Sequence, residues 1–234
     1  MDEIIKESGL DARLVSLDDT FRFNCTECGK CCIEREDILL TPRDLFRASK
    51  ECGMAVEDFF KENCEIYIGG NSRLPIVRFK PRGSVRRCPM LENRRCRIHR
   101  AKPVVCAMYP VGRAMSLNKD TGETKVCYLL NRTICGDGSK KHTVRNWLTE
   151  SGIELNDAFY VKWSRLLPEL QARTAALEPR CTREAMVTVW DLMSWLVYFH
   201  YDTAKGFDAQ FDENADYLLR LLDKLLEDDA EVES

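Results

Sequence analysis

The chain has 234 residues, of which 44% are hydrophobic, and its formal net charge at pH 7 is -3. This length fits one large domain or two small ones, and the hydrophobic content suffices for a core that does not depend on a metal. A net charge so near zero excludes a strong overall attraction to nucleic acid or to anionic membranes. Residues 1–19 lack the regions of a secretory signal, and no apolar run reaches the ~20 residues of a spanning helix. We therefore expect a cytoplasmic protein with no membrane-spanning segment.

The first part of the chain predicts short elements. Residues 1–20 are typical of a weakly structured lead-in or a short helix, and residues 21–23 alternate like a strand that leads to Cys25. Residues 38–40 form a short apolar strand or bend. A helix is expected over 41–53, because Thr41 is a good N-cap, Pro42 suits the first helical position and Gly53 suits the end. A second short helix is expected over 56–60.

Two β-hairpins are predicted further along the chain. The first covers residues 65–80 and turns at Gly69–Ser72, and the second covers residues 114–128 and turns at Asn118–Gly122. Pro75 places the returning strand of the first hairpin at a sheet edge or at the start of that strand. Between the hairpins, residues 86–110 predict irregular chain interrupted by prolines.

From Lys141 onward the apolar residues recur at helical spacing, which predicts a helical bundle. Pro168 is expected to kink or split one helix, and Thr182 to cap the start of the next. That helix is apolar on most sides, which places it centrally in the bundle. Tyr217–Leu226 predicts an amphipathic helix with an acidic end.

The expected fold class is α+β, with a loop-rich cysteine domain that has short strands and packs on helices. The predicted division is a lead-in over 1–20, a metal-binding domain over 21–140, a helical bundle over 141–228 and an acidic tail over 229–234. No internal repeat is visible.

The chain contains twelve cysteines. In a reducing compartment they stay as thiols, so metal binding is a better interpretation than disulfides. Four thiols lie within Cys25-Thr-Glu-Cys28-Gly-Lys-Cys31-Cys32, and short loops can bring such thiols to one metal. Adjacent Cys31 and Cys32 are expected to point in different directions, which favours two sites or a bridged cluster over one simple zinc finger. Further thiols follow at Cys88, Cys96 and Cys106.

The order and spacing of these residues resemble the YkgJ-type cysteine-cluster family, which is described as zinc- or iron-chelating. The residues that carry the resemblance are Cys25-x2-Cys28-Gly29-x-Cys31-Cys32, Cys88-Pro89-Met90-Leu91, Cys96-Arg97-Ile98, Pro103-x2-Cys106-x2-Tyr109-Pro110 and Cys135-Gly136. The resemblance covers about residues 23–140. It implies eight metal ligands: Cys25, Cys28, Cys31, Cys32, Cys88, Cys96, Cys106 and Cys135. Eight thiols suit two four-ligand sites or one multinuclear cluster.

Two departures from the family pattern are visible. His99 stands where the family usually has Tyr or Phe, and Lys102 stands where it usually has Arg. Lys102 cannot make the planar, two-pronged contact of an arginine. His99 is interpreted as a surface or supporting residue rather than a ligand, because enough thiols are already present.

The implied cofactor is zinc, iron or an iron–sulfur cluster, and the primary function is metal binding. A flagellin lysine methylase shares the downstream cysteine pattern, so an alternative is an iron–sulfur enzyme that uses S-adenosylmethionine. The chain lacks the phosphate-binding loop, the zinc-protease helix motif, the hydrolase elbow and the Cys-x3-Cys-x2-Cys spacing of radical enzymes. Metal storage or sensing has little support.

The remaining features have weaker interpretations. Cys52, Cys64 and Cys181 are expected to be structural, and Cys127 stays open as a ligand. Residues 78–102 contain ten basic residues and one acidic residue, which suit compensation of thiolate charge or docking of an acidic partner. The stretch lacks aromatic residues for stacking, so nucleic acid is not the expected partner.

Overall fold

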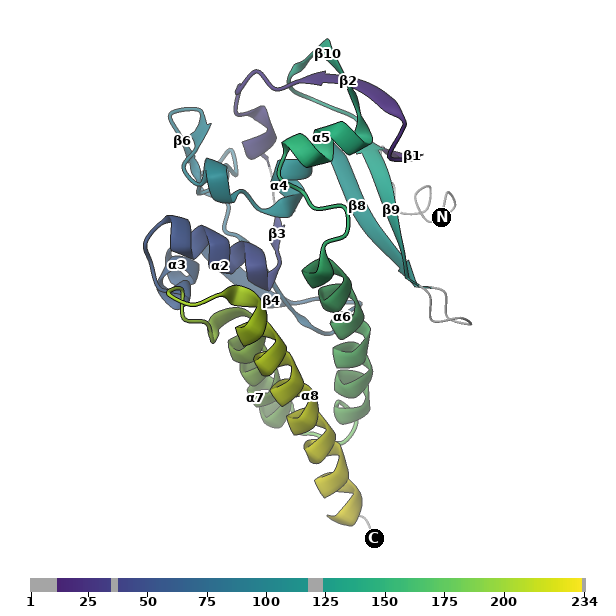
Figure 1. The fold of residues 1–234 in the computed structure, drawn as a ribbon. Helices are drawn as coiled ribbons and strands as arrows, with labels where there is room; N and C mark the ends of the chain where they lie inside the picture. The colour runs from purple at the N-terminus through teal and green to yellow at the C-terminus, as the bar shows by residue number, and fades with distance from the viewer. Residues whose placement is uncertain (1–11, 35–37, 118–123, 233–234) are drawn as a thin grey trace. The chain divides into compact units, whose positions relative to one another are not determined.

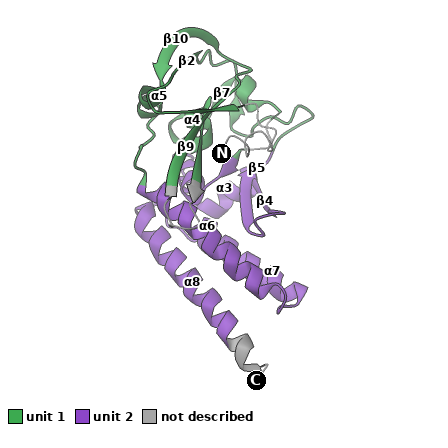
Figure 2. Ribbon diagram, turned by 90° about the vertical axis from the view of Figure 1, so that its right-hand side faces the viewer, with its two compact units in different colours: residues 1–38, 81–157 green, residues 39–80, 158–234 purple. Residues whose placement is uncertain are grey.

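A computed structural model describes residues 12–34, 38–117 and 124–232 of the chain. It confirms the α+β class, with short antiparallel strands and a helical C-terminal region (Figure 1). The chain separates into two compact units, one of residues 1–38 and 81–157 and the other of residues 39–80 and 158–234 (Figure 2). Each unit is therefore built from two separate stretches of the chain. The predicted domain boundary at residue 140 stays a prediction.

The first unit contains two antiparallel sheets. One has the strand order β1-β9-β8, formed by Ala12–Val15, Thr124–Asn131 and Val111–Leu117. The other pairs β2 (Thr20–Asn24) with β10 (Asp137–Thr143) in antiparallel register. The turn between β8 and β9 lies outside the described residues.

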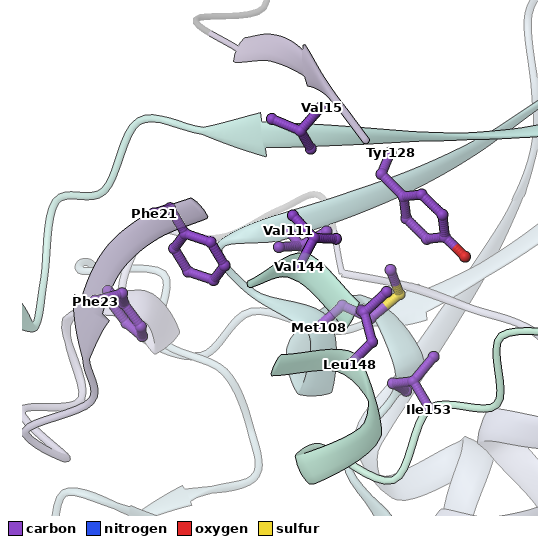
Figure 3. Close-up of a cluster of buried hydrophobic side chains, with 9 residues drawn as sticks. All are labelled: Val15, Phe21, Phe23, Met108, Val111, Tyr128, Val144, Leu148 and Ile153. Carbon is purple, nitrogen blue, oxygen red and sulfur yellow. The ribbon is translucent and has the colours of Figure 1, made fainter. Parts of the chain in front are cut away.

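Two short helices cover the apolar side of these strands. They are α4 (Val104–Met108) and α5 (Val144–Glu150), and Thr143 caps α5 by accepting a hydrogen bond from the Asn146 N–H. Figure 3 shows the buried cluster between these elements, which consists of Val15, Phe21, Phe23, Met108, Val111, Tyr128, Val144, Leu148 and Ile153. Cys135 packs at the edge of this cluster. The core therefore adjoins the cysteine-rich region at Cys135.

The cysteine-rich segments have little regular structure of their own. Their elements are η1 (Lys30–Cys32), the two-residue strands β6 (Leu91–Glu92) and β7 (Arg95–Cys96), and η2 (His99–Ala101). Most of the non-glycine residues with positive φ in the described chain lie here: Glu27, Glu34, Arg86, Asn93 and Arg94. A left-handed conformation costs such a residue ~1–3 kcal/mol. These loops therefore need contacts outside their own backbone to keep their shape.

The second unit begins with a three-stranded antiparallel sheet of order β3-β5-β4. Its strands are Leu39–Leu40, Pro75–Phe79 and Cys64–Ile68, so Pro75 starts the central strand. The helix α2 (Pro42–Glu51) follows β3, and α3 (Val56–Asn63) precedes β4. Thr41 and Asp44 form a reciprocal capping box at the start of α2.

Four helical segments complete the second unit. They are α6 (Ala158–Leu177), α7 (Arg183–Ser194), the π-helical segment η3 (Trp195–Phe199) and α8 (Phe207–Val232). Leu218 of α8 is fully buried, and Phe207 and Phe211 stack on each other and each pack edge-on against Phe159. Within the described ranges, no helix combines the length and the apolar character needed to cross a bilayer.

Several expectations are confirmed, including the strand before Cys25, the helix capped by Thr41, both hairpins and the Thr182 cap.

Other expectations differ from the structure. Ala12–Val15 is a strand because it pairs with the edge of β9, and Asp137–Thr143 is a strand because it pairs with β2. Pro168 lies inside α6 and does not split it, so of the predicted kink or split only the kink stays a prediction. Val187 is 46% exposed, so α7 is buried on one side only.

A buried ion pair in the first unit provides a stability test. Arg113 and Asp157 lie 3.7 Å apart, with side chains only 4% and 5% exposed. We expect Asp157→Asn to lower the free energy of unfolding by roughly 3 kcal/mol, because it leaves a buried guanidinium without its carboxylate. The matched control is Asp18→Asn, because the Asp18–Arg145 pair is exposed and should contribute less than ~0.5 kcal/mol. Equal effects of the two substitutions in urea unfolding would contradict the prediction.

Candidate metal centre

The sulfur of Cys28 lies among hydrogen-bond donors of the backbone. The Lys30 N–H is the main group that lowers the pKa of this thiol, and the Gly136 N–H and the Thr26 hydroxyl lower it further. Partial burial opposes these contributions. Donors directed at a sulfur favour the thiolate over the thiol, and the thiolate is the form that binds metal. The surroundings of Cys28 therefore favour the form of the side chain that could bind a metal.

Gly136 can reach Cys28 only because it has no side chain. A Cβ on Gly136 would lie 2.6 Å from a ring carbon of Phe23 and 2.7 Å from the carbonyl oxygen of Asn24, and its φ is +72°. This close approach follows from the β2–β10 register, in which Asp137 pairs with Asn24. The same register brings Cys25 and Cys135 to one end of the strand pair.

Cys31 and Cys32 lie on the single turn of η1, which begins at Gly29 with a φ of 72°. The N–H of Cys32 donates to the Gly29 carbonyl at 3.0 Å. The two sulfurs are 3.9 Å apart, so the expectation that they point in different directions is wrong: the tight turn keeps both thiols on one side. The edge of a tetrahedral zinc site with ~2.3 Å bonds is about 3.8 Å, so this pair fits two neighbouring ligand positions.

Cys32 is close to a group of downstream thiols. Its pKa is raised, first by the contact with the Cys31 thiol, then by burial, and then by the charges of Cys31, Cys88 and Cys106. A backbone hydrogen bond of 2.8 Å from the Cys88 N–H to the Cys32 carbonyl fixes these two segments together. Cys88 is 6% exposed, and Cys106 comes from α4.

Cys135 is close to a different group of thiols. Burial is the main cause that raises its pKa, and the charges of Cys31, Cys28 and Cys25 raise it further, whereas the Tyr109 hydroxyl lowers it. The Cys135 sulfur and the Tyr109 oxygen are 3.9 Å apart. The pKa of Tyr109 is raised to about 12, mainly by burial, and Cys135 and Cys31 contribute.

Seven of the eight predicted ligands thus fall into two groups that meet at Cys31 and Cys32. The first contains Cys25, Cys28, Cys31 and Cys135, and the second contains Cys32, Cys88 and Cys106, with Cys31 beside it. Cys25 is exposed and Cys88 is buried, so the first group is nearer to solvent. Among the described residues, no three His, Cys, Asp or Glu side chains form a group that could already hold a metal ion.

The eighth predicted ligand, Cys96, is half-buried and pairs with Leu91 across β6 and β7. The pKa of His99 is lowered, first by partial burial and then by the Lys102 charge, while Glu27 opposes them. The Cys127 sulfur lies 4.0 Å from the Lys125 carbonyl on β9. Its role as a ligand stays open.

The cysteines outside the predicted set lie in the second unit, except for Cys127. Cys64 is buried at the start of β4, as expected for a structural residue. Cys52 follows α2 and Cys181 precedes Thr182, and both are partly exposed.

The spacing and grouping of these thiols agree with a known domain. Residues 24–135 match the model of the CxxCxxCC family, described as "Putative zinc- or iron-chelating domain". The match supports metal binding by this part of the chain, with zinc or iron as the cofactor. Comparison with the curated proteins and with solved structures gave no significant match.

Three groups around the thiols have roles that the sequence pattern alone does not reveal. These are the Gly136 N–H, the Tyr109 hydroxyl and the Phe23 ring, which packs edge-on against Tyr109 with centroids 5.9 Å apart. The available signals were the position of Tyr109 three residues after Cys106 and of Gly136 directly after Cys135. Neither spacing shows which sulfur the group contacts.

Gly136→Ala tests the support of the first group. We expect the free energy of unfolding to fall by roughly 3 kcal/mol, because the new methyl group overlaps Phe23 and Asn24 and a left-handed alanine is strained. Metal affinity should fall as well. Gly152→Ala is a matched control, because its φ is also +72° but nothing lies within 4 Å of its Cβ position. It should cost only ~1 kcal/mol and leave metal affinity unchanged.

Urea unfolding and chelator competition on both variants give the two quantities. Equal losses of stability, or an unchanged metal affinity of Gly136→Ala, would show that Gly136 does not support the site.

Proposed function

We propose that the CxxCxxCC domain binds two metal ions, zinc or iron, through two thiolate groups that meet at Cys31 and Cys32. The observation that carries the proposal is the position of Cys31, whose sulfur is 3.9 Å from Cys32 and whose charge also acts on Cys135. One thiol is thus beside ligands of both groups. A mononuclear zinc finger takes four ligands, which is fewer than the eight predicted thiols.

The second group can obtain its fourth sulfur in two ways. Cys96 can join Cys32, Cys88 and Cys106, which gives two separate four-thiolate sites. Alternatively, Cys31 can bridge both metals, which gives a binuclear cluster that does not need Cys96. Cys31 and Cys32 are spaced like neighbouring ligands of one metal, which favours the bridged arrangement.

The charges around the thiols support two metals. Residues 24–38 and 81–102 contain ten basic and five acidic residues, a formal net charge of +5. Two zinc ions with four thiolates each carry a formal charge of about -4. The basic stretch therefore nearly balances the proposed centre, and this agreement supports charge compensation as its main role. Docking of an acidic partner remains the second interpretation.

The backbone of the same loops supports a structural role for the metal. Five non-glycine residues there hold positive φ, and the regular elements are only two or three residues long. Metal–thiolate bonds can supply the free energy that such loops lack. Removal of the metal should therefore unfold them.

The alternative is an iron–sulfur enzyme. The exposure of Cys25 favours it to a limited degree, because an exposed ligand is the easiest to replace by a substrate. Iron with bound sulfide and a coloured protein after anaerobic purification would support this alternative. Stoichiometric zinc in a colourless protein would contradict it.

Metal counts on cysteine variants test the proposal. We expect two metals per wild-type chain and about one per chain in Cys28→Ser and Cys88→Ser, because each substitution breaks one group. Cys181 lies outside the domain, so the Cys181→Ser variant should keep two metals. Cys96→Ser should keep two in the bridged arrangement and lose one in the separate arrangement. A wild-type chain with one metal or none would contradict the proposal.

The thiol pKa values predict how metal affinity depends on pH. The pKa values of Cys32 and Cys135 are raised, so these thiols keep their protons in the metal-free protein and must release them on binding. Affinity should therefore fall as the pH falls, by about tenfold per pH unit for each proton released. Zinc titrations against a chelator between about pH 6 and pH 8 measure this slope. A pH-independent affinity would exclude these thiols as ligands.

A further inference from the structure

The Tyr109 hydroxyl oxygen lies 3.9 Å from the Cys135 sulfur. Its oxygen also accepts a hydrogen bond from the Ile134 N–H at 3.4 Å. The oxygen therefore contacts two consecutive residues of the segment that leads into β10. This arrangement fixes the backbone just before Cys135 and places a polar hydrogen beside its sulfur.

The phenol ring is held in place by the unit around it. It packs edge-on against Phe23 at 5.9 Å, and Phe23 in turn packs edge-on against Trp147 at 5.5 Å. The Trp147 indole N–H donates to the Met108 carbonyl at 2.8 Å, which fixes the residue before Tyr109. Tyr109 is thus a rigid group, and it directly follows the helix that carries Cys106.

We propose that Tyr109 is a positioning residue of the metal centre, whose hydroxyl donates an O–H···S hydrogen bond to the Cys135 thiolate. The inference rests on the proposed function, because it applies to Cys135 as a metal ligand. In the metal-free protein the thiol is the donor to the Tyr109 oxygen. On metal binding the thiol proton leaves to solvent, the sulfur can only accept, and the hydroxyl becomes the donor. The Ile134 N–H still satisfies the phenol oxygen.

The hydrogen bond has two consequences for the centre. It withdraws electron density from the Cys135 sulfur, and hydrogen bonds to sulfur tune the properties of a bound metal. It also connects the two thiolate groups, because Tyr109 follows Cys106 of the second group and contacts Cys135 of the first. Outer groups of this kind typically change metal affinity by ~10–100-fold.

Tyr109→Phe in cobalt(II)-substituted protein tests the inference, because it removes only the hydroxyl. We expect the sulfur-to-cobalt charge-transfer band to move to lower energy, since the sulfur regains electron density. We also expect one of the two metals to be released to a chelator at least ~10-fold faster. Tyr128→Phe is the matched control. It is a buried tyrosine of the same apolar cluster, and it should change neither the band nor the release rate.

A second measurement needs no variant. In wild-type protein loaded with a spin-active cadmium isotope, the Tyr109 hydroxyl proton should show coupling to the metal through the sulfur. An unshifted band with unchanged release in Tyr109→Phe, or a cadmium-bound sulfur without this coupling, would overturn the role of Tyr109. If wild-type protein shows no charge-transfer band at all, the proposed thiolate centre itself fails, and the inference fails with it.

Discussion

The proposed metal centre depends on the hydrogen bonds that two backbone N–H groups, those of Lys30 and Gly136, make to the sulfur of Cys28. The Lys30 N–H comes from the cysteine turn, and the Gly136 N–H comes from the residue before β10. Their convergence requires the antiparallel pairing of β2 with β10, and it requires that residue 136 has no side chain. Phe23 of β2 belongs to the buried apolar cluster, so the core holds this strand in place. The surroundings of Cys28 therefore favour its thiolate form before any metal binds.

The proposed centre extends from exposed Cys25 to buried Cys88. The first group of thiols reaches solvent at Cys25, and the second ends at the buried Cys88. The turn with Cys31 and Cys32 lies between the groups. In the proposed centre, the net positive charge of the downstream basic stretch offsets the thiolate charge. Buried charge of this size is stable only when it is compensated, so the proposed metals and the basic residues would both compensate the thiolates.

Many helices and strands, and the candidate ligands, could be predicted from the sequence, because capping residues, alternation and cysteine spacing are local signals. Thr41, Thr182 and the strand before Cys25 are examples. The strands Ala12–Val15 and Asp137–Thr143 could not be predicted, since each depends on a partner more than a hundred residues away. The contacts of Tyr109 and the division of the thiols depend on the same long-range pairing. The directions of the Cys31 and Cys32 side chains could not be predicted, because the turn geometry rather than the residue spacing decides where their sulfurs lie.

In the proposed centre, thiolates alone hold the metals. X-ray absorption at the metal edge of the purified, metal-loaded protein identifies the ligand atoms. We expect four sulfur ligands per metal at about 2.3 Å and, for the bridged arrangement, a second metal scatterer beyond them. A first shell of nitrogen or oxygen atoms, or fewer than three sulfurs per metal, would contradict this expectation.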